Sequence, residues 1–286
     1  MPFISGDIIK ILFVPSTIGM HEIYFREVTD YLEGEDGRIE AETFLPVTLE
    51  EYREKGFTLE KYAEELETKL KTPNDTGEID EYMLVSLSNG GNALLDAALD
   101  HDNVRAAVFC DFVGDWDYQD LIFKVATYVF EHIPKLGDWK PTMKLMLSSM
   151  FDHSKNEKIY QELVELTETH GGKDLINALT DTKKHTFGKR KYIEKLEELV
   201  AKKDIRVYSI EATKSADTKK YFNAIDLPEI ERTRIESRHL IPLQKPEELA
   251  EKLHEIYKET LKRCGPIAPT EPFPQEQQEL LQILSL

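Results

Sequence analysis

Short apolar runs, each of the length of a buried β-strand, alternate along this chain with longer stretches of helical periodicity. The apolar runs lie at residues 8–14, 39–45, 81–86, 104–110, 204–210 and 230–236. The helical patterns lie at residues 21–33, 58–71, 90–100, 218–224 and 245–262. Parallel neighbours in a sheet need a crossover of helix length, because a tight turn can join only antiparallel strands. The pattern therefore predicts an α/β fold, with a mostly parallel central sheet and helices on both of its faces.

The alternation breaks off between Gly114 and about Arg190, where no strand is recognisable and aromatic and methionine residues are frequent. An insertion that follows a strand of an open parallel sheet lies at the carboxyl edge, where ligands bind. We therefore expect a helical lid at 114–190, although the same residues would equally suit a helical subdomain with its own core. The main core is expected to comprise residues 1–113 and 191–264, and 265–286 to form a Pro-rich connector and an amphipathic C-terminal tail.

The net charge and the cysteine content of the chain limit the classes of partner and cofactor that we expect. In 286 residues, 54 Asp and Glu exceed 36 Lys and Arg, which gives a net charge of −18. Such a chain repels polyanions, so nucleic acid is not an expected partner. The two cysteines, Cys110 and Cys264, form neither a disulfide framework nor a C-x-x-C pair, and the sequence implies no metal or cofactor. The apolar run at 8–14 is too short to span a membrane and lacks the flanks of a signal peptide, so we expect a cytoplasmic protein.

Ser88 lies between the strand pattern at 81–86 and the helix pattern at 90–100, within the sequence Ser-Leu-Ser-Asn-Gly. Enzymes with a nucleophilic serine can place it in a strand-turn-helix elbow of the form G-x-S-x-G, where small residues let the strand and helix approach closely. Here Ser86 stands in place of the first glycine and Gly90 supplies the second. The context predicts a nucleophile. The alternative interpretation is that Ser88 only caps the helix.

A serine nucleophile needs a base, and the base needs an acid that orients it. His239 is the favoured base, because it follows the last strand pattern and is therefore expected at the same sheet edge as Ser88. The order of the strands cannot choose the acid, since each candidate follows a strand that ends at that edge. The candidates are Asp111, Asp217 and Glu211.

Several stretches of the sequence carry a resemblance to a known family. ILFVPSTIGMHEIYFREVTDYL looks like its opening strand, Pro-x-x-x-Gly loop and first helix, and FTLEKYAEELETKL looks like the helix before its elbow strand. YMLVSLSNGGNALLDAAL looks like the elbow, and the next strand ends in FCDF, where the family typically has an aspartate. Over residues 9–115 and 204–257 the chain thus resembles the thioesterase domains that release products from polyketide and nonribosomal peptide synthetases, within the α/β-hydrolase superfamily.

The resemblance implies an α/β-hydrolase fold and a catalytic triad of Ser88, Asp111 and His239. Thioesterases of this kind commonly carry the acid after the strand that follows the elbow, which favours Asp111. In a general lipase or esterase the later position would be favoured, so Asp217 is the alternative acid.

The same resemblance implies an oxyanion hole formed by the backbone N–H groups of Asn89 and Thr17, with Ser16 as an alternative to Thr17. Ser16 and His21 are expected to line the substrate site, since both follow the first strand pattern closely.

The implied function is a serine acyl hydrolase or acyltransferase that forms an acyl-Ser88 intermediate. Its substrate would be a thioester or ester, released by hydrolysis or cyclisation as a hydrophobic acyl, polyketide or peptide chain. An acyl or peptidyl carrier protein is a candidate partner. Two alternatives remain open: a carboxylester or lactone hydrolase that acts on free small molecules, and a noncatalytic binding protein that keeps the fold.

Overall fold

A computed structural model describes most of the two core segments of the chain and part of the segment between them. The described residues are 9–16, 22–36, 39–45, 58–112, 125, 128, 132, 147, 150–152, 156–170, 191–202, 204–215 and 227–264.

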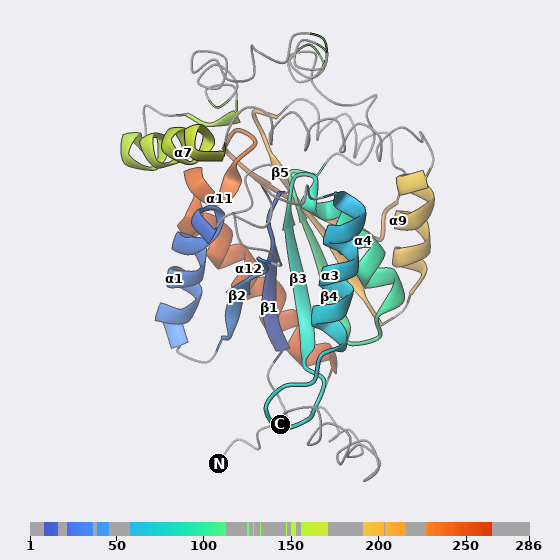
Figure 1. The fold of residues 1–286 in the computed structure, drawn as a ribbon. Helices are drawn as coiled ribbons and strands as arrows, with labels where there is room; N and C mark the ends of the chain where they lie inside the picture. Colours follow the sequence, from blue (N-terminus) through green and yellow to red (C-terminus); the bar gives the residue numbers. More distant parts are fainter. Residues whose placement is uncertain are drawn as a thin grey trace, which may run out of the picture.

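The described residues contain one sheet of six strands, all paired in parallel (Figure 1). The strands are β1 (Ile9–Val14), β2 (Ala41–Thr43), β3 (Glu81–Leu87), β4 (Val104–Cys110), β5 (Arg206–Ala212) and β6 (Glu231–Ile235). Their order across the sheet is β2-β1-β3-β4-β5-β6. The predicted parallel sheet is therefore confirmed.

Helices cover both faces of this sheet, as the alternation of strands and helices predicts (Figure 1). One face carries α1 (Arg26–Asp36), α11 (Ile241–Gln244) and α12 (Pro246–Cys264), and the other carries α3 (Leu59–Lys71), α4 (Gly90–Asp100) and α9 (Lys191–Ala201). A short 3-10 helix, η1 (Glu22–Tyr24), precedes α1. Buried side chains of α7 (Glu157–His170) belong to the same core cluster as those of α11.

The four inner strands, β1, β3, β4 and β5, divide their side chains between two cores. In β1, Ile11 and Phe13 belong to the core beneath α1 and α12, whereas Leu12 and Val14 belong to the core beneath α3, α4 and α9. Successive side chains of a strand point to opposite faces, and a parallel sheet covered on both faces reads as a continuous apolar run. This is why the strands could be recognised in the sequence.

The register of the sheet places the ends of its strands at a common edge. Val14 of β1 pairs with Ser86 of β3, and Leu87 pairs with Cys110 of β4. Cys110 in turn pairs with Ile210 of β5. The segments that follow β1, β3, β4 and β5 therefore all leave the sheet at its carboxyl edge, where open parallel sheets bind ligands.

The bounds of several elements differ from the sequence prediction. The sequence predicts a second strand at 39–45, but only Ala41–Thr43 forms β2, which lies at the edge of the sheet and pairs with β1 alone. The helix expected at 21–33 begins at Arg26, after η1, and continues to Asp36. The helix expected near 218–224 lies outside the described residues.

The described part of the segment 114–190 packs against the main core. Phe151, and Ile159 and Leu163 of α7, are buried in the same cluster as side chains of α1 and α12. Arg26 of α1 forms an ion pair with Glu162 of α7, at 2.8 Å. The remainder of this segment and residues 265–286 lie outside the described residues, so the division into core, lid and tail stays a prediction.

Candidate active site

Ser88 is the single residue between the end of β3 at Leu87 and the cap residue of α4, Asn89. Its φ is +53°, a left-handed conformation that costs a non-glycine residue about 1–2 kcal/mol. Its N–H donates to the carbonyl of Cys110 at 3.0 Å, which ties the turn to the end of β4. Residues held in such a conformation cluster at functional sites. The helix-capping alternative does not describe this geometry, because the cap residue is Asn89.

The elbow is tight because β1 approaches the first turn of α4. A Cβ atom on Gly90 would lie 2.5 Å from the carbonyl oxygens of both Val14 and Pro15, and one on Gly91 would collide with the ring of Phe112. Ser86, which replaces the usual glycine, is fully buried, and its hydroxyl lies within 3.4 Å of the carbonyl of Val108. The substitution at Ser86 is thus accommodated within the sheet.

Gly90→Ala is expected to destabilise the fold by about 1–3 kcal/mol, because the two carbonyl oxygens that its Cβ would meet belong to the backbone and cannot rotate away. Gly34→Ala is the matched control, since Gly34 lies in α1 with no atom near its added Cβ. That control should gain about 0.5–1 kcal/mol from helix propensity. Urea unfolding measures both changes, and equal stabilities of the two variants would contradict this packing of the elbow.

Asp111 and His239 meet at the carboxyl edge although 128 residues separate them in the sequence. Oδ2 of Asp111 lies 2.5 Å from Nδ1 of His239, and Oδ1 accepts a hydrogen bond from the N–H of Ala212 at 3.1 Å. Asp111 is fully buried and has a φ of +44°, whereas the side chain of His239 is 21% exposed. Both carboxylate oxygens of Asp111 have a partner, so the carboxylate is held in one orientation. Because His239 is partly exposed, its imidazole can still reach a bound molecule.

The preceding residue, Cys110, is not a competing nucleophile. Burial raises the pKa of its thiol, and the negative charge of Asp111 raises it further. The thiol therefore stays protonated, and only a thiolate is strongly nucleophilic.

The other candidates divide into those that the structure describes and those that it does not. Glu211 is buried, and its Oε2 accepts a hydrogen bond from Nε of Arg234 at 3.1 Å, whereas the carboxylate that contacts Nδ1 of His239 is that of Asp111. Thr17, His21 and Asp217 lie outside the described residues. Their expected roles stay predictions.

The loop after β1 contacts the elbow directly. The hydroxyl of Ser16 donates to Oδ1 of Asn89 at 2.6 Å, and both residues are buried. The hydroxyl of Tyr62 on α3 donates to the carbonyl of Pro15 at 3.1 Å. Sequence reasoning missed Tyr62, because its place on the apolar face of α3 is that of an ordinary core residue.

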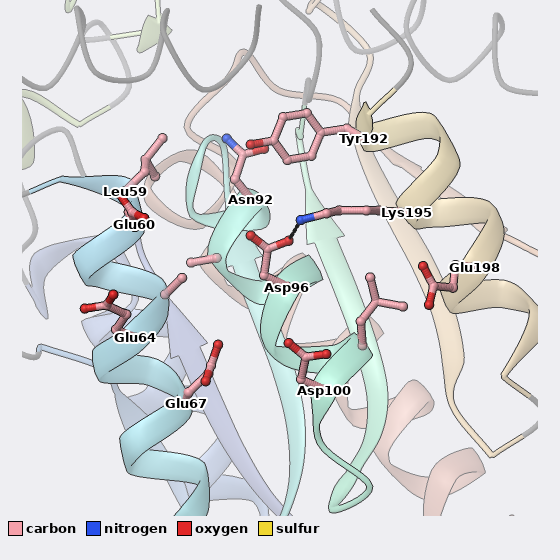
Figure 2. Close-up of a pocket in the computed structure, with 13 residues that line it drawn as sticks. Leu59, Glu60, Glu64, Glu67, Asn92, Asp96, Asp100, Tyr192, Lys195 and Glu198 are labelled. Carbon is pink, nitrogen blue, oxygen red and sulfur yellow. Dashed lines mark hydrogen bonds and ion pairs between the residues drawn. The ribbon is translucent and has the colours of Figure 1, made fainter. Parts of the chain in front are cut away.

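A groove of about 460 Å³ runs along the outer surfaces of α3, α4 and α9 (Figure 2). Its walls carry carboxylates, and Lys195 of α9 pairs with Asp96 of α4. The acidic residues that line it are Glu60, Glu64, Glu67, Asp96, Asp100 and Glu198. Neither Ser88 nor Asp111 nor His239 lines this groove, and its charge is unsuited to an apolar acyl chain.

Within the described ranges, His, Cys, Asp and Glu residues form no group of three or more that could hold a metal ion. The helices of the described residues include none that is both long and apolar enough to cross a membrane.

No protein-family model matches the sequence, and no curated protein matches it. Several solved structures, in contrast, superpose on this chain. AqDC, which recognises and cleaves the ring of the Pseudomonas quinolone signal, superposes with a TM-score of 0.70 at 14% identity, over 88% of this chain and 92% of AqDC. MenH from S. aureus gives a TM-score of 0.67 at 11% identity, over 90% and 96% of the two chains.

A thermophilic esterase from Thermogutta terrifontis also superposes, with a TM-score of 0.64 at 14% identity, over 89% of this chain and 91% of the esterase. At such identities the likeness concerns the fold alone. What this chain shares with these structures is the arrangement of its chain, over 88–90% of its length. The chain has the α/β-hydrolase fold.

Proposed function

We propose that this protein is a serine acyl hydrolase or acyltransferase of the thioesterase type, with Ser88 as nucleophile, His239 as base and Asp111 as the orienting acid. The observation that carries the proposal is the 2.5 Å contact between Asp111 and His239, at the sheet edge where Ser88 occupies its left-handed elbow. A serine, a histidine and a buried carboxylate at one edge supply the three groups that acyl transfer to a hydroxyl requires.

In the proposed reaction, Nε2 of His239 takes the proton of Ser88 as Oγ attacks the carbonyl carbon of a thioester or ester. Asp111 keeps the Nδ1 proton in place and stabilises the imidazolium that forms. The backbone N–H groups of Asn89 and Thr17 would hold the oxyanion. His239 then returns the proton to the departing thiolate or alkoxide, which leaves an acyl-Ser88 ester. Water, or a hydroxyl or amine of the acyl chain, resolves this ester and frees Ser88.

The proposed substrate is a hydrophobic acyl, polyketide or peptide chain, presented as a thioester on an acyl or peptidyl carrier protein in the cytoplasm. This assignment is supported by the resemblance of the elbow and of the FCDF strand end to thioesterase domains. The alternative is a carboxylester or lactone hydrolase, which the shared fold with the Thermogutta terrifontis esterase favours. The third hypothesis is a noncatalytic binding protein that keeps the fold.

Paired substrates separate these functions. The same acyl group is offered as an N-acetylcysteamine thioester and as the matching oxygen ester, and hydrolysis is followed for the full chain. We expect kcat/KM for the thioester to exceed that for the oxygen ester by about tenfold or more, which corresponds to about 1.4 kcal/mol in activation free energy. A preference for the oxygen ester would select the esterase alternative. Folded protein that turns over neither substrate and resists a fluorophosphonate would favour the binding protein.

A further inference from the structure

The chain immediately after β1 is held between α3 and α4 by buried polar contacts. The hydroxyl of Tyr62 on α3 bonds to the carbonyl of Pro15, at 3.1 Å. One residue later, the hydroxyl of Ser16 bonds to the side chain of Asn89 at 2.6 Å. Gly90 completes the contact, because its missing side chain allows the Pro15 carbonyl to approach α4. Tyr62 is fully buried, and Ser16 and Asn89 are 6% and 5% exposed.

The Tyr62 contact sets the orientation of a backbone N–H group. In a trans peptide the carbonyl and the N–H of the next residue point in opposite directions, and the described residues contain no cis peptide bond. The carbonyl of Pro15 points to Tyr62, so the N–H of Ser16 points away from α3. The orientation of the peptide plane between Pro15 and Ser16 is thereby fixed.

The contact between Ser16 and Asn89 fixes a second quantity, the separation of two chain segments. Asn89 follows Ser88 directly, and its backbone N–H is one expected oxyanion donor. The other expected donor is the backbone N–H of Thr17, the residue after Ser16, or that of Ser16 itself as the alternative. A 2.6 Å hydrogen bond between the side chains of Ser16 and Asn89 therefore joins the two segments that would supply the oxyanion hole.

Tyr62 carries a hydroxyl at a buried position where an apolar side chain would suffice for packing. Leu59, Leu66 and Leu70 share its buried face of α3, where a tyrosine hydroxyl is costly unless it is bonded. Burial raises the pKa of Tyr62 well above its ordinary value, so its hydroxyl remains a donor throughout the physiological pH range.

We propose that Tyr62 and Ser16 are positioning residues that hold the backbone of Pro15 and Ser16 in register with the elbow, so that the expected oxyanion donors of the two segments keep a fixed separation. This inference rests on the proposed function. Neither side chain is assigned to the reacting atoms; each acts through the backbone. Donors stabilise an oxyanion at about 2.7–3.1 Å, and a displacement of about 1 Å can cost about a hundredfold in rate.

The first test is Tyr62→Phe and Ser16→Ala in the full chain, with p-nitrophenyl butyrate as the probe. We expect kcat to fall by about 10- to 100-fold in each variant while KM stays within about twofold, because the donors act on charge that develops in the transition state. Ser16→Thr keeps a hydroxyl and should recover most of the lost kcat. Tyr82→Phe is the matched control, since Tyr82 is also buried but lies at the amino end of β3, and it should keep the wild-type kcat.

A double-mutant cycle tests the contact between the loop and the elbow. Asn89→Ala keeps its backbone N–H but loses the acceptor of Ser16, so it should match Ser16→Ala, and the double variant should be no slower than either single one. Additive losses would overturn the inference. So would a loss of kcat that Ser16→Thr fails to recover, because a merely structural role would then suffice.

Ser88→Ala in the same assay separates this inference from the proposed function. If Ser88→Ala retains wild-type turnover, both the proposed function and the positioning role are wrong. If Ser88→Ala is inactive while Tyr62→Phe and Ser16→Ala keep the wild-type kcat, the function stands and only the positioning role is wrong.

Discussion

Replacing Ser88 with alanine is expected to abolish labelling by a fluorophosphonate and to lower kcat by about 10⁴- to 10⁶-fold. The physical reason is that Ser88 alone supplies the oxygen to which the acyl group would be transferred. Intact-mass spectrometry measures the label as one added phosphonyl group, and steady-state hydrolysis of an acyl thioester measures kcat. Labelling of Ser88→Ala at the wild-type rate would show that another residue reacts and would remove Ser88 from the mechanism.

Ser88→Gly is the informative companion to Ser88→Ala. Both lack the hydroxyl, but glycine adopts a φ of +53° without the steric cost that alanine retains. The gain is partly offset because glycine makes the unfolded chain more flexible. We expect Ser88→Gly to be as inactive as Ser88→Ala and more stable by about 0.5–1 kcal/mol. Urea unfolding of the two inactive variants measures the difference, and equal stabilities would argue against strain at the elbow.

The sheet could be predicted because the physics that forms it is local. The inner strands β1, β3, β4 and β5 are buried on both faces and therefore read as apolar runs. Parallel neighbours also require connections of helix length, which the helical patterns between the runs supply. The bounds of β2 were overestimated, because residue types such as those at 39–45 do not record where backbone pairing with β1 begins and ends. Thus the existence of an element follows from the sequence more readily than its bounds.

The candidate site was only partly accessible to the same reasoning. Ser88 could be proposed because an elbow is a local feature, a serine among small residues between a strand and a helix. The order of the strands could not choose the acid among Asp111, Asp217 and Glu211, because each follows a strand that ends at the same edge. The preference for Asp111 came from the family resemblance alone. What brings Asp111 to His239, across a sequence separation of 128, is the fold of the chain between them. Tyr62 could not be found at all, because the apolar periodicity of α3 already accounts for it.

Asp111→Asn is expected to lower kcat by about 10³- to 10⁴-fold while leaving the fold intact. Asparagine tolerates the left-handed φ of this position, and its Oδ1 can still accept the N–H of Ala212. Its Nδ2, however, would donate towards Nδ1 of His239. The imidazole would then carry its proton on Nε2 and could not take the proton of Ser88.

Asp217→Asn is the matched comparison, because it makes the same chemical change in the alternative acid. We expect its kcat to stay within about twofold of the wild type, as for substitutions outside the reacting groups. The rate of fluorophosphonate labelling, measured for both variants, reports on the activation of Ser88 separately from the release of the acyl group. If Asp217→Asn lowers the labelling rate and kcat while Asp111→Asn keeps the wild-type values, the orienting acid is Asp217. Equal and large losses in both would mean that the two carboxylates act on His239 together.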